Sequence, residues 1–137
     1  MTRRVKLYQS FQNQGEIDKM DARIFQLREK MSANLSQNWT LEKMAEAIGV
    51  SKSHLQKIFK TETGKTPYAF LHDERLEKAR ELLEGDWEQI GQIGLKIGMP
   101  HESHFTRDFK KKYGLTPTAY RKQYHENIQA EMQFGQK

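Results

Sequence analysis

The amino-acid sequence repeats itself at an offset of about 50 residues, which limits the chain to folds that hold two copies of one small structure. Upstream, from Leu41 with Ile90 to Val50 with Met99, the offset is one residue shorter. A repeat of this length indicates a duplicated supersecondary unit. We expect the extra residue of the second copy at the start of its basic helix. The downstream pairs are Leu55 and Phe105, Lys57 and Arg107, Phe59 and Phe109, Lys60 and Lys110, Gly64 and Gly114, Thr66 and Thr116, Pro67 and Pro117, Ala69 and Ala119, and Phe70 and Tyr120.

The first copy has the sequence pattern of two short helices separated by a tight turn. Thr40 and Ser51 can accept hydrogen bonds from the N–H groups of a first helical turn, so each is expected to cap a helix. Between them, Gly49 is suited to the left-handed conformation that ends a helix. This order is that of a helix-turn-helix motif. The apolar residues that recur at helical spacing are Leu41, Met44, Ala45, Ile48, Leu55, Ile58 and Phe59.

The helix that follows Ser51 is basic on the side away from its apolar stripe. Ser53, Gln56 and Lys57 are residue types that hydrogen-bond base edges in the major groove of DNA. Lys52 and Lys60 are better placed to contact phosphates, which supply affinity without sequence information. The alternative interpretation is an ordinary solvated helix face, and the repeat favours the DNA-binding one.

These patterns predict an all-α fold in which two helix-turn-helix subdomains, each a homeodomain-like three-helix unit, are joined by a long linker helix. The expected core anchors are Leu55 and Phe59 in the first unit, and Phe105 and Phe109 in the second. The predicted segments are an N-terminal arm or linker at 1–20, a first unit at 21–65, a connecting helix at 66–85, a second unit at 86–124 and a flexible C-terminal tail at 125–137.

Three residues that precede the copied helices have expected structural roles. Trp39 and Trp87 each come before the first helix of a copy, and we interpret both as packing residues. Asp86 is expected to cap the first helix of the second copy.

Composition narrows the classes of function. The chain has 23 Lys and Arg against 18 Asp and Glu, a formal charge of +5, which favours an anionic partner such as nucleic acid. It contains no cysteine, which excludes disulfides, thiolate metal sites and a nucleophilic thiol. No apolar run approaches the roughly 20 residues of a membrane span. We therefore expect a soluble, cytosolic protein.

No catalytic or cofactor-binding pattern is found. His101-Glu102-x-His104 lacks a matched third metal ligand. The glycines at Gly91, Gly94 and Gly98 lack the spacing and the trailing Lys-Ser/Thr of a phosphate loop. The carboxylates fall on charged helix faces. We expect no metal, no cofactor and no enzymatic activity.

A set of residues keeps one spacing through both copies. Its members are Leu41-x-x-Met44-Ala45, Gly49-Val50-Ser51, Leu55-x-x-x-Phe59-Lys60, Gly64, Arg75-Leu76-x-x-Ala79, Ile93-Gly94-x-x-x-Gly98-Met99, Ser103-x-Phe105-x-Arg107-x-Phe109-Lys110 and Gly114-x-Thr116-Pro117-x-x-Tyr120-Arg121. Over residues 21–124 this set resembles the DNA-binding domain of the AraC/XylS family of bacterial transcription regulators. The chain is similar to the small members that lack a separate effector domain.

Three positions depart from the family pattern. Gly94 stands where alanine is common, Met99 where phenylalanine follows the glycine, and Pro100 where a serine-like cap is frequent. The smaller or softer residues are expected to loosen the second turn, and Pro100 has no side chain that can cap. We therefore expect the first recognition helix to supply the larger share of specific contacts.

The resemblance implies that the second basic helix also enters the major groove. Arg107 is the expected guanine contact. Glu102 would accept from a cytosine amine or repel a phosphate, or it is an acid that stabilises the first turn of its helix. Lys110 and Lys111 are expected phosphate contacts. The base-contacting positions in this helix are Glu102, Ser103, His104, Thr106 and Arg107.

The function that the resemblance implies is sequence-specific regulation of transcription, and we expect an activator. Its expected partners are double-stranded DNA, read as an asymmetric site by a monomer or weakly self-associating monomers, and RNA polymerase. Its expected location is the bacterial cytoplasm, on the nucleoid.

Other interpretations remain. The chain could be the output domain of a longer ligand-sensing regulator, with residues 1–20 as a former linker. It could instead be a helical protein-interaction module whose basic faces dock an acidic partner. A DNA-repair protein with a similar helical domain would need a methyl-accepting thiol, which the sequence lacks.

Overall fold

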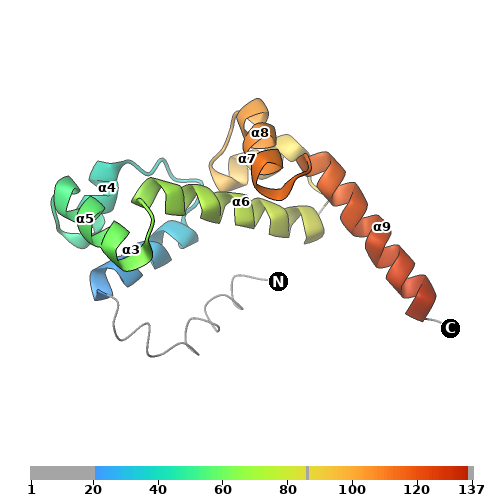
Figure 1. Ribbon diagram of the computed structural model, residues 1–137. Coiled ribbons are helices and arrows are strands. Elements are labelled where there is room, and N and C mark those ends of the chain that lie inside the picture. The colour runs from blue at the N-terminus through green and yellow to red at the C-terminus, as the bar shows by residue number, and fades with distance from the viewer. Residues whose placement is uncertain (1–20, 86, 136–137) are drawn as a thin grey trace. The chain divides into compact units, whose positions relative to one another are not determined.

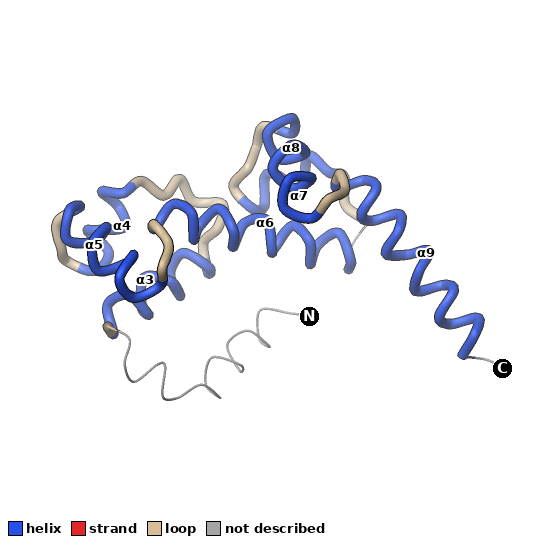
Figure 2. The backbone as a smooth tube through the Cα atoms, in the orientation of Figure 1, coloured by secondary structure: helices blue, strands red, loops and turns tan. Residues whose placement is uncertain are grey.

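The computed structural model describes residues 21–85 and 87–135, and within these ranges the backbone forms seven α-helices and no strand (Figures 1 and 2). The predicted all-α class is therefore confirmed. The predicted arm at residues 1–20 lies outside the described residues. The chain divides into two compact units, with the boundary between Glu74 and Arg75.

The first unit contains α3 (Ala22–Ala33), α4 (Leu41–Ile48), α5 (Lys52–Thr63) and the start of α6 (Pro67–Gly85). The two predicted caps are confirmed: Thr40 Oγ1 accepts from the backbone N–H of Lys43 at 3.1 Å, and Ser51 Oγ accepts from that of His54 at 3.1 Å. These bonds satisfy N–H groups that the helices leave without an internal partner. The sequence thus places the starts of α4 and α5.

The turn between α4 and α5 depends on Gly49, which has a φ of 70°. The N–H of Val50 donates to the carbonyl of Ala45 at 3.1 Å, and that of Gly49 donates to Glu46 at 3.2 Å. This pair of bonds closes the end of a helix when the residue after it is left-handed. The predicted C-cap is confirmed, and α5 follows after a short turn.

A single apolar core holds the first unit together. Phe59 contacts Phe70 edge to face, with ring centroids 5.6 Å apart. Trp39 packs into this core as predicted, and its indole N–H donates to the Asn34 carbonyl at 2.9 Å. The core residues are Ile24, Leu27, Met31, Leu35, Trp39, Met44, Ala45, Leu55, Phe59, Phe70 and Leu71.

The second unit contains the rest of α6, α7 (Ile90–Ile97), α8 (Glu102–Tyr113) and α9 (Pro117–Gly135). The later part of α6 supplies Leu76, Ala79 and Leu83 to its core, as α3 supplies apolar residues to the first. The linker helix is therefore also the first helix of the second unit. The remaining buried residues of this core are Ile93, Ile97, Phe105 and Phe109.

The second turn is one residue longer than the first, and the extra residue lies in the turn itself. Met99 N–H donates to the Gly94 carbonyl at 2.8 Å, as Val50 does to Ala45, so the extra residue follows Met99. The residue at the N-cap of α8 is His101, which makes no side-chain cap. The prediction that Pro100 occupies the capping position is therefore wrong, although α8 does lack a side-chain cap.

Gly94 fits this longer turn. A Cβ at this position would lie only 2.6 Å from the backbone oxygen of Met99. The expectation that Gly94 loosens the turn is therefore wrong, because the turn approaches α7 too closely for alanine. In the first unit, the matching Ala45 is buried with its methyl group.

Three predictions concern the ends of the second unit. Trp87 is predicted to be a packing residue: its ring stacks on His125 with centroids 4.3 Å apart, but its side chain is 74% exposed and lies outside the core. Asp86 lies outside the described residues, and the N-cap residue of α7 is Gln89, which makes no side-chain cap. The expected tail boundary at 125 falls inside α9, which runs to Gly135.

Among the described helices, none is long and apolar enough to cross a membrane.

We expect Gly94→Ala to lower the free energy of unfolding by about 1–3 kcal/mol, because the added methyl group would force the Met99 carbonyl to move. Gly91→Ala is the matched control in the same helix. Its Cβ would meet only Glu102 Oε2, at an ordinary 3.5 Å, so helix propensity should raise stability by up to about 1 kcal/mol. Urea denaturation followed by circular dichroism measures both. Equal effects would show that close approach does not select glycine at position 94.

Candidate nucleic-acid interface

The α5 helix presents a polar stripe opposite its buried edge. Ser53, Gln56, Lys57 and Lys60 are exposed and follow the spacing i, i+3, i+4 and i+7, which places them on one helix face. We call this set the α5 stripe. The predicted anchors Leu55 and Phe59 are fully buried on the other side. The rotation of α5 about its axis is thereby fixed with these polar groups turned outward.

The α8 helix presents the same stripe at the matching positions. Ser103, Arg107 and Lys110 are exposed and Thr106 is half-buried, and these four residues form the α8 stripe. Phe105 and Phe109 are fully buried, with Phe109 edge to face against Tyr120 at 5.6 Å. Two predicted contacts, His104 and Lys111, are exposed on a row beside this stripe. The two stripes differ in chemistry, because a glutamine and a lysine in one correspond to a threonine and an arginine in the other.

The first residue of each recognition helix faces the helix before it. Lys52 Nζ pairs with Glu42 Oε1 at 3.2 Å. In the second unit, Glu102 Oε2 lies 3.5 Å from where a Cβ on Gly91 would be. Glu42 and Gly91 are both the second residue of their helices, so the two pairs occupy equivalent positions in the two units.

This geometry bears on two predicted DNA contacts. Lys52 reaches a carboxylate of its own unit, and Glu102 lies beside the first turns of α7 and α8. Backbone N–H groups at a helix start carry partial positive charge, which stabilises an anion there. The structure therefore favours the helix-stabilising interpretation of Glu102 over a contact with cytosine.

Two histidines lie close together beside the α8 stripe. The rings of His101 and His104 are 5.4 Å apart between centroids. Within the described ranges, no group of three or more His, Cys, Asp or Glu side chains could hold a metal ion.

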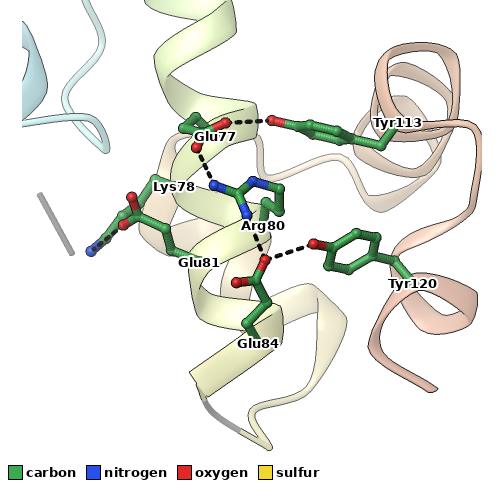
Figure 3. A network of polar contacts seen from close by, with 7 residues as sticks. All are labelled: Glu77, Lys78, Arg80, Glu81, Glu84, Tyr113 and Tyr120. Atoms are coloured by element: carbon green, nitrogen blue, oxygen red, sulfur yellow. Dashed lines mark hydrogen bonds and ion pairs between the residues drawn. The ribbon is translucent and has the colours of Figure 1, made fainter. Parts of the chain in front are cut away.

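A polar network holds α8 and α9 against α6 inside the second unit (Figure 3). The hydroxyl of Tyr113 donates to Glu77 at 2.9 Å, and that of Tyr120 donates to Glu84 at 2.6 Å. Arg80 pairs with both carboxylates. We call these five residues the tyrosine–carboxylate network. Because Tyr113 is the last residue of α8, the network fixes the end of this recognition helix.

The network perturbs its own titratable groups. Burial raises the pKa of Tyr113, and the hydrogen bond to Glu77 adds to this, since each favours the neutral phenol. Burial is also the main cause of the raised pKa of Tyr120, and its hydrogen bond to Glu84 is the second cause. The pKa of Arg80 is raised chiefly by its hydrogen bond to Glu77. All three groups therefore keep their neutral-pH protonation states.

Sequence reasoning missed this network, although a signal for it exists. Glu77, Arg80 and Glu84 lie at i, i+3 and i+7 on α6, each one residue after a buried apolar residue of the same helix. The first unit holds the corresponding aromatic residue by a different contact. There the guanidinium carbon of Arg28 lies 4.9 Å from the ring centroid of Phe70, which matches Tyr120 but has no hydroxyl.

Comparison with known proteins gives consistent matches. A family model described as a helix-turn-helix domain matches residues 44–123. The regulator MtrA of Neisseria gonorrhoeae is 32% identical over 75% of this chain and 34% of its own length. The xylose operon regulatory protein of Escherichia coli K12 is 42% identical over 59% of this chain and 21% of its own length. The chain thus spans about a third or less of the length of these relatives.

Solved structures share the fold. The C-terminal domain of AraT, a response regulator from Geobacillus stearothermophilus, has a TM-score of 0.73 and 31% identity, covering 77% of this chain and 88% of that domain. The DNA-binding domain of AdpA, solved in complex with a target DNA, has a TM-score of 0.73 and 21% identity, covering 76% of this chain and 94% of that domain. At that identity, the second likeness shows the fold alone.

The tyrosine–carboxylate network predicts a loss of stability in alkali. The folded-state pKa of Tyr113 and Tyr120 lies above the unfolded value near 10. Their contribution is therefore complete below about pH 10 and is lost as the pH rises toward the folded-state pKa. We expect the free energy of unfolding to fall as the pH rises from about 10 to about 11.5, and to fall less steeply in the variant Tyr113→Phe/Tyr120→Phe. Tyr68→Phe, at an exposed tyrosine, is the control and should keep the wild-type slope. Identical slopes in wild type and double variant would contradict this role.

Proposed function

Because the chain belongs to the AraC-type family of helix-turn-helix transcription regulators, we propose that it activates transcription by inserting α5 and α8 into successive major-groove segments of one asymmetric DNA site. As a member of this family it is a DNA-binding transcription regulator. Successive segments lie one helical turn, about 34 Å, apart. The observation that carries the proposal is the pair of matching polar stripes, each on a basic helix anchored by fully buried side chains.

The chemistry of the two stripes supports contacts with different bases. The side-chain amide of Gln56 can make two hydrogen bonds to adenine, and Lys57 can reach the acceptors of guanine. Arg107 can donate two parallel hydrogen bonds to O6 and N7 of one guanine. Because the stripes differ, the two half-sites would differ in sequence. A single chain would then bind an asymmetric site.

Phosphate contacts would supply most of the affinity. Lys60, Lys110 and Lys111 are exposed next to the base-contacting positions, where they can neutralise backbone charge and release counterions. Lys52 remains a candidate once its pairing with Glu42 is exchanged for a phosphate.

We extend the proposal to the wider role that the family suggests. We expect binding as a monomer, or as weakly self-associating monomers, together with contact to RNA polymerase. The expected location is the nucleoid in the bacterial cytoplasm. No enzymatic step is expected.

Two alternatives have distinct tests. The greater length of MtrA and of the xylose regulator supports the alternative that this sequence is the output domain of a longer ligand-sensing regulator. The length of the source gene tests it. A helical protein-interaction module is a different class of function. Binding to random duplex DNA that weakens as salt rises would contradict it.

We expect Gln56→Ala and Arg107→Ala to relax sequence preference, each losing about 1–3 kcal/mol of discrimination at one base pair. Selection of bound sequences from a random duplex pool, followed by affinity measurements on single-base variants, measures this. Changes on α5 should cost more than those on α8, because α8 lacks a side-chain cap. If a variant loses the same affinity for all sequences, the assignment of that residue to a base contact is contradicted.

Lys60→Ala should behave differently. Because a phosphate contact carries no base information, we expect affinity to fall by a similar factor for every duplex. The slope of log affinity against log salt should also flatten by about one unit. Titrations at several salt concentrations check this, with Lys65→Ala as a control at a lysine that pairs with Asp73 at 2.7 Å. An unchanged slope would remove Lys60 from the interface.

A further inference from the structure

The guanidinium of Arg107 is held by its neighbour in the sequence. Its Nε–H donates to Asp108 Oδ1 at 2.9 Å. The Arg107 side chain is 67% exposed and that of Asp108 only 20%. Successive helical residues leave the axis about 100° apart and do not normally face each other. Arg107 must therefore bend across the helix surface to reach this carboxylate, at the edge of the α8 stripe.

We propose that Asp108 is a positioning residue that orients the Arg107 guanidinium for recognition of a guanine. This rests on the proposed function, since it assigns a specificity role within the same DNA-binding site. The bond to Asp108 uses Nε and not the terminal amino groups, Nη1 and Nη2. Those two groups form the outer edge of the planar guanidinium, which matches the O6 and N7 acceptors of one guanine.

Ordering the arginine before DNA arrives strengthens the specific contact. A long side chain that is immobilised on binding weakens the complex by its lost rotamer freedom. A guanidinium that is bonded to Asp108 in the unbound protein has already given up part of that freedom. It is also less able to swing onto a phosphate, which would add affinity without discrimination.

The same carboxylate works against general affinity. A negative charge on a recognition helix repels the phosphates of every sequence alike. Removing it should therefore strengthen binding to random DNA while weakening discrimination at one base. These two effects have opposite signs, so they separate an orienting role from a purely electrostatic one.

The first unit supports this interpretation by contrast. At the matching positions Lys57 is followed by Ile58, so the acid accompanies the arginine and not the lysine. A lysine ammonium is a compact charge without a planar fork, and its contacts depend less on orientation. An orienting carboxylate is useful only beside the guanidinium.

The test compares affinities of the full chain for two duplexes: a site selected by the wild-type protein from a random pool, and the same site with the Arg107-dependent guanine replaced. The variants are Asp108→Asn, Arg107→Ala and the double variant. We expect Asp108→Asn to lower the affinity ratio of the two duplexes roughly three- to tenfold, with unchanged or higher affinity for random DNA. In the Arg107→Ala background, Asp108→Asn should leave the ratio unchanged.

Two controls guard the interpretation. Glu131→Gln removes an equal charge from an exposed site on α9 and should not alter the ratio. If Asp108→Asn lowers the thermal midpoint enough to unfold the protein at the assay temperature, Asp108→Ala, with its higher helix propensity, replaces it.

Each remaining outcome has one meaning. An unchanged ratio in Asp108→Asn, or an equal loss with and without Arg107, overturns the proposal while the wild type still selects a site. A wild type that selects no sequence overturns the proposed function itself.

Discussion

Burial of one edge of each recognition helix is the constraint on which the rest of the structure depends. Phe59 and Phe109 are fully buried and meet Phe70 and Tyr120 edge to face. Burying one such side chain contributes roughly 1.5–3 kcal/mol, and a second buried residue one turn earlier, Leu55 or Phe105, removes the freedom to rotate about the helix axis. The opposite side of each helix must then face outward. The polar stripes are therefore consequences of the apolar anchors.

The two units reach this arrangement with different chemistry. In the first, Arg28 lies over the face of Phe70. In the second, Tyr120 adds a hydroxyl, and Glu84 on α6 receives it. A half-buried carboxylate is costly unless it is hydrogen-bonded and paired, which explains why Arg80 bridges the two acids of the tyrosine–carboxylate network. The second unit thus has directional hydrogen bonds, which fix the end of α8, in place of the contact between the Arg28 guanidinium and the Phe70 ring.

The turns show why the residues of a motif cannot be judged one at a time. In the sequence, Gly94 and Pro100 look like two separate weaknesses of the second copy. In the structure, one extra residue in the turn brings the Met99 carbonyl to within 2.6 Å of a Cβ at position 94, and glycine makes room for it. The glycine at position 94 therefore compensates for the extra residue in the turn, so the two departures belong together. The capping position passes to His101, because the longer turn moves the start of α8 by one residue.

The sequence by itself determined the helices, their order, the caps at Thr40 and Ser51, and the outward face of each recognition helix, because these follow from local spacing and from single side chains bonding to the adjacent backbone. Only the tertiary structure decided what lies across from a given side chain. It set Glu102 beside Gly91, joined Tyr113 to Glu77 across 36 positions of sequence, and made α6 a part of the second core. It also left Trp87 exposed where its sequence position resembles that of the buried Trp39. Periodicity states which face of a helix is apolar, but the partner of each face is fixed by how the helices pack.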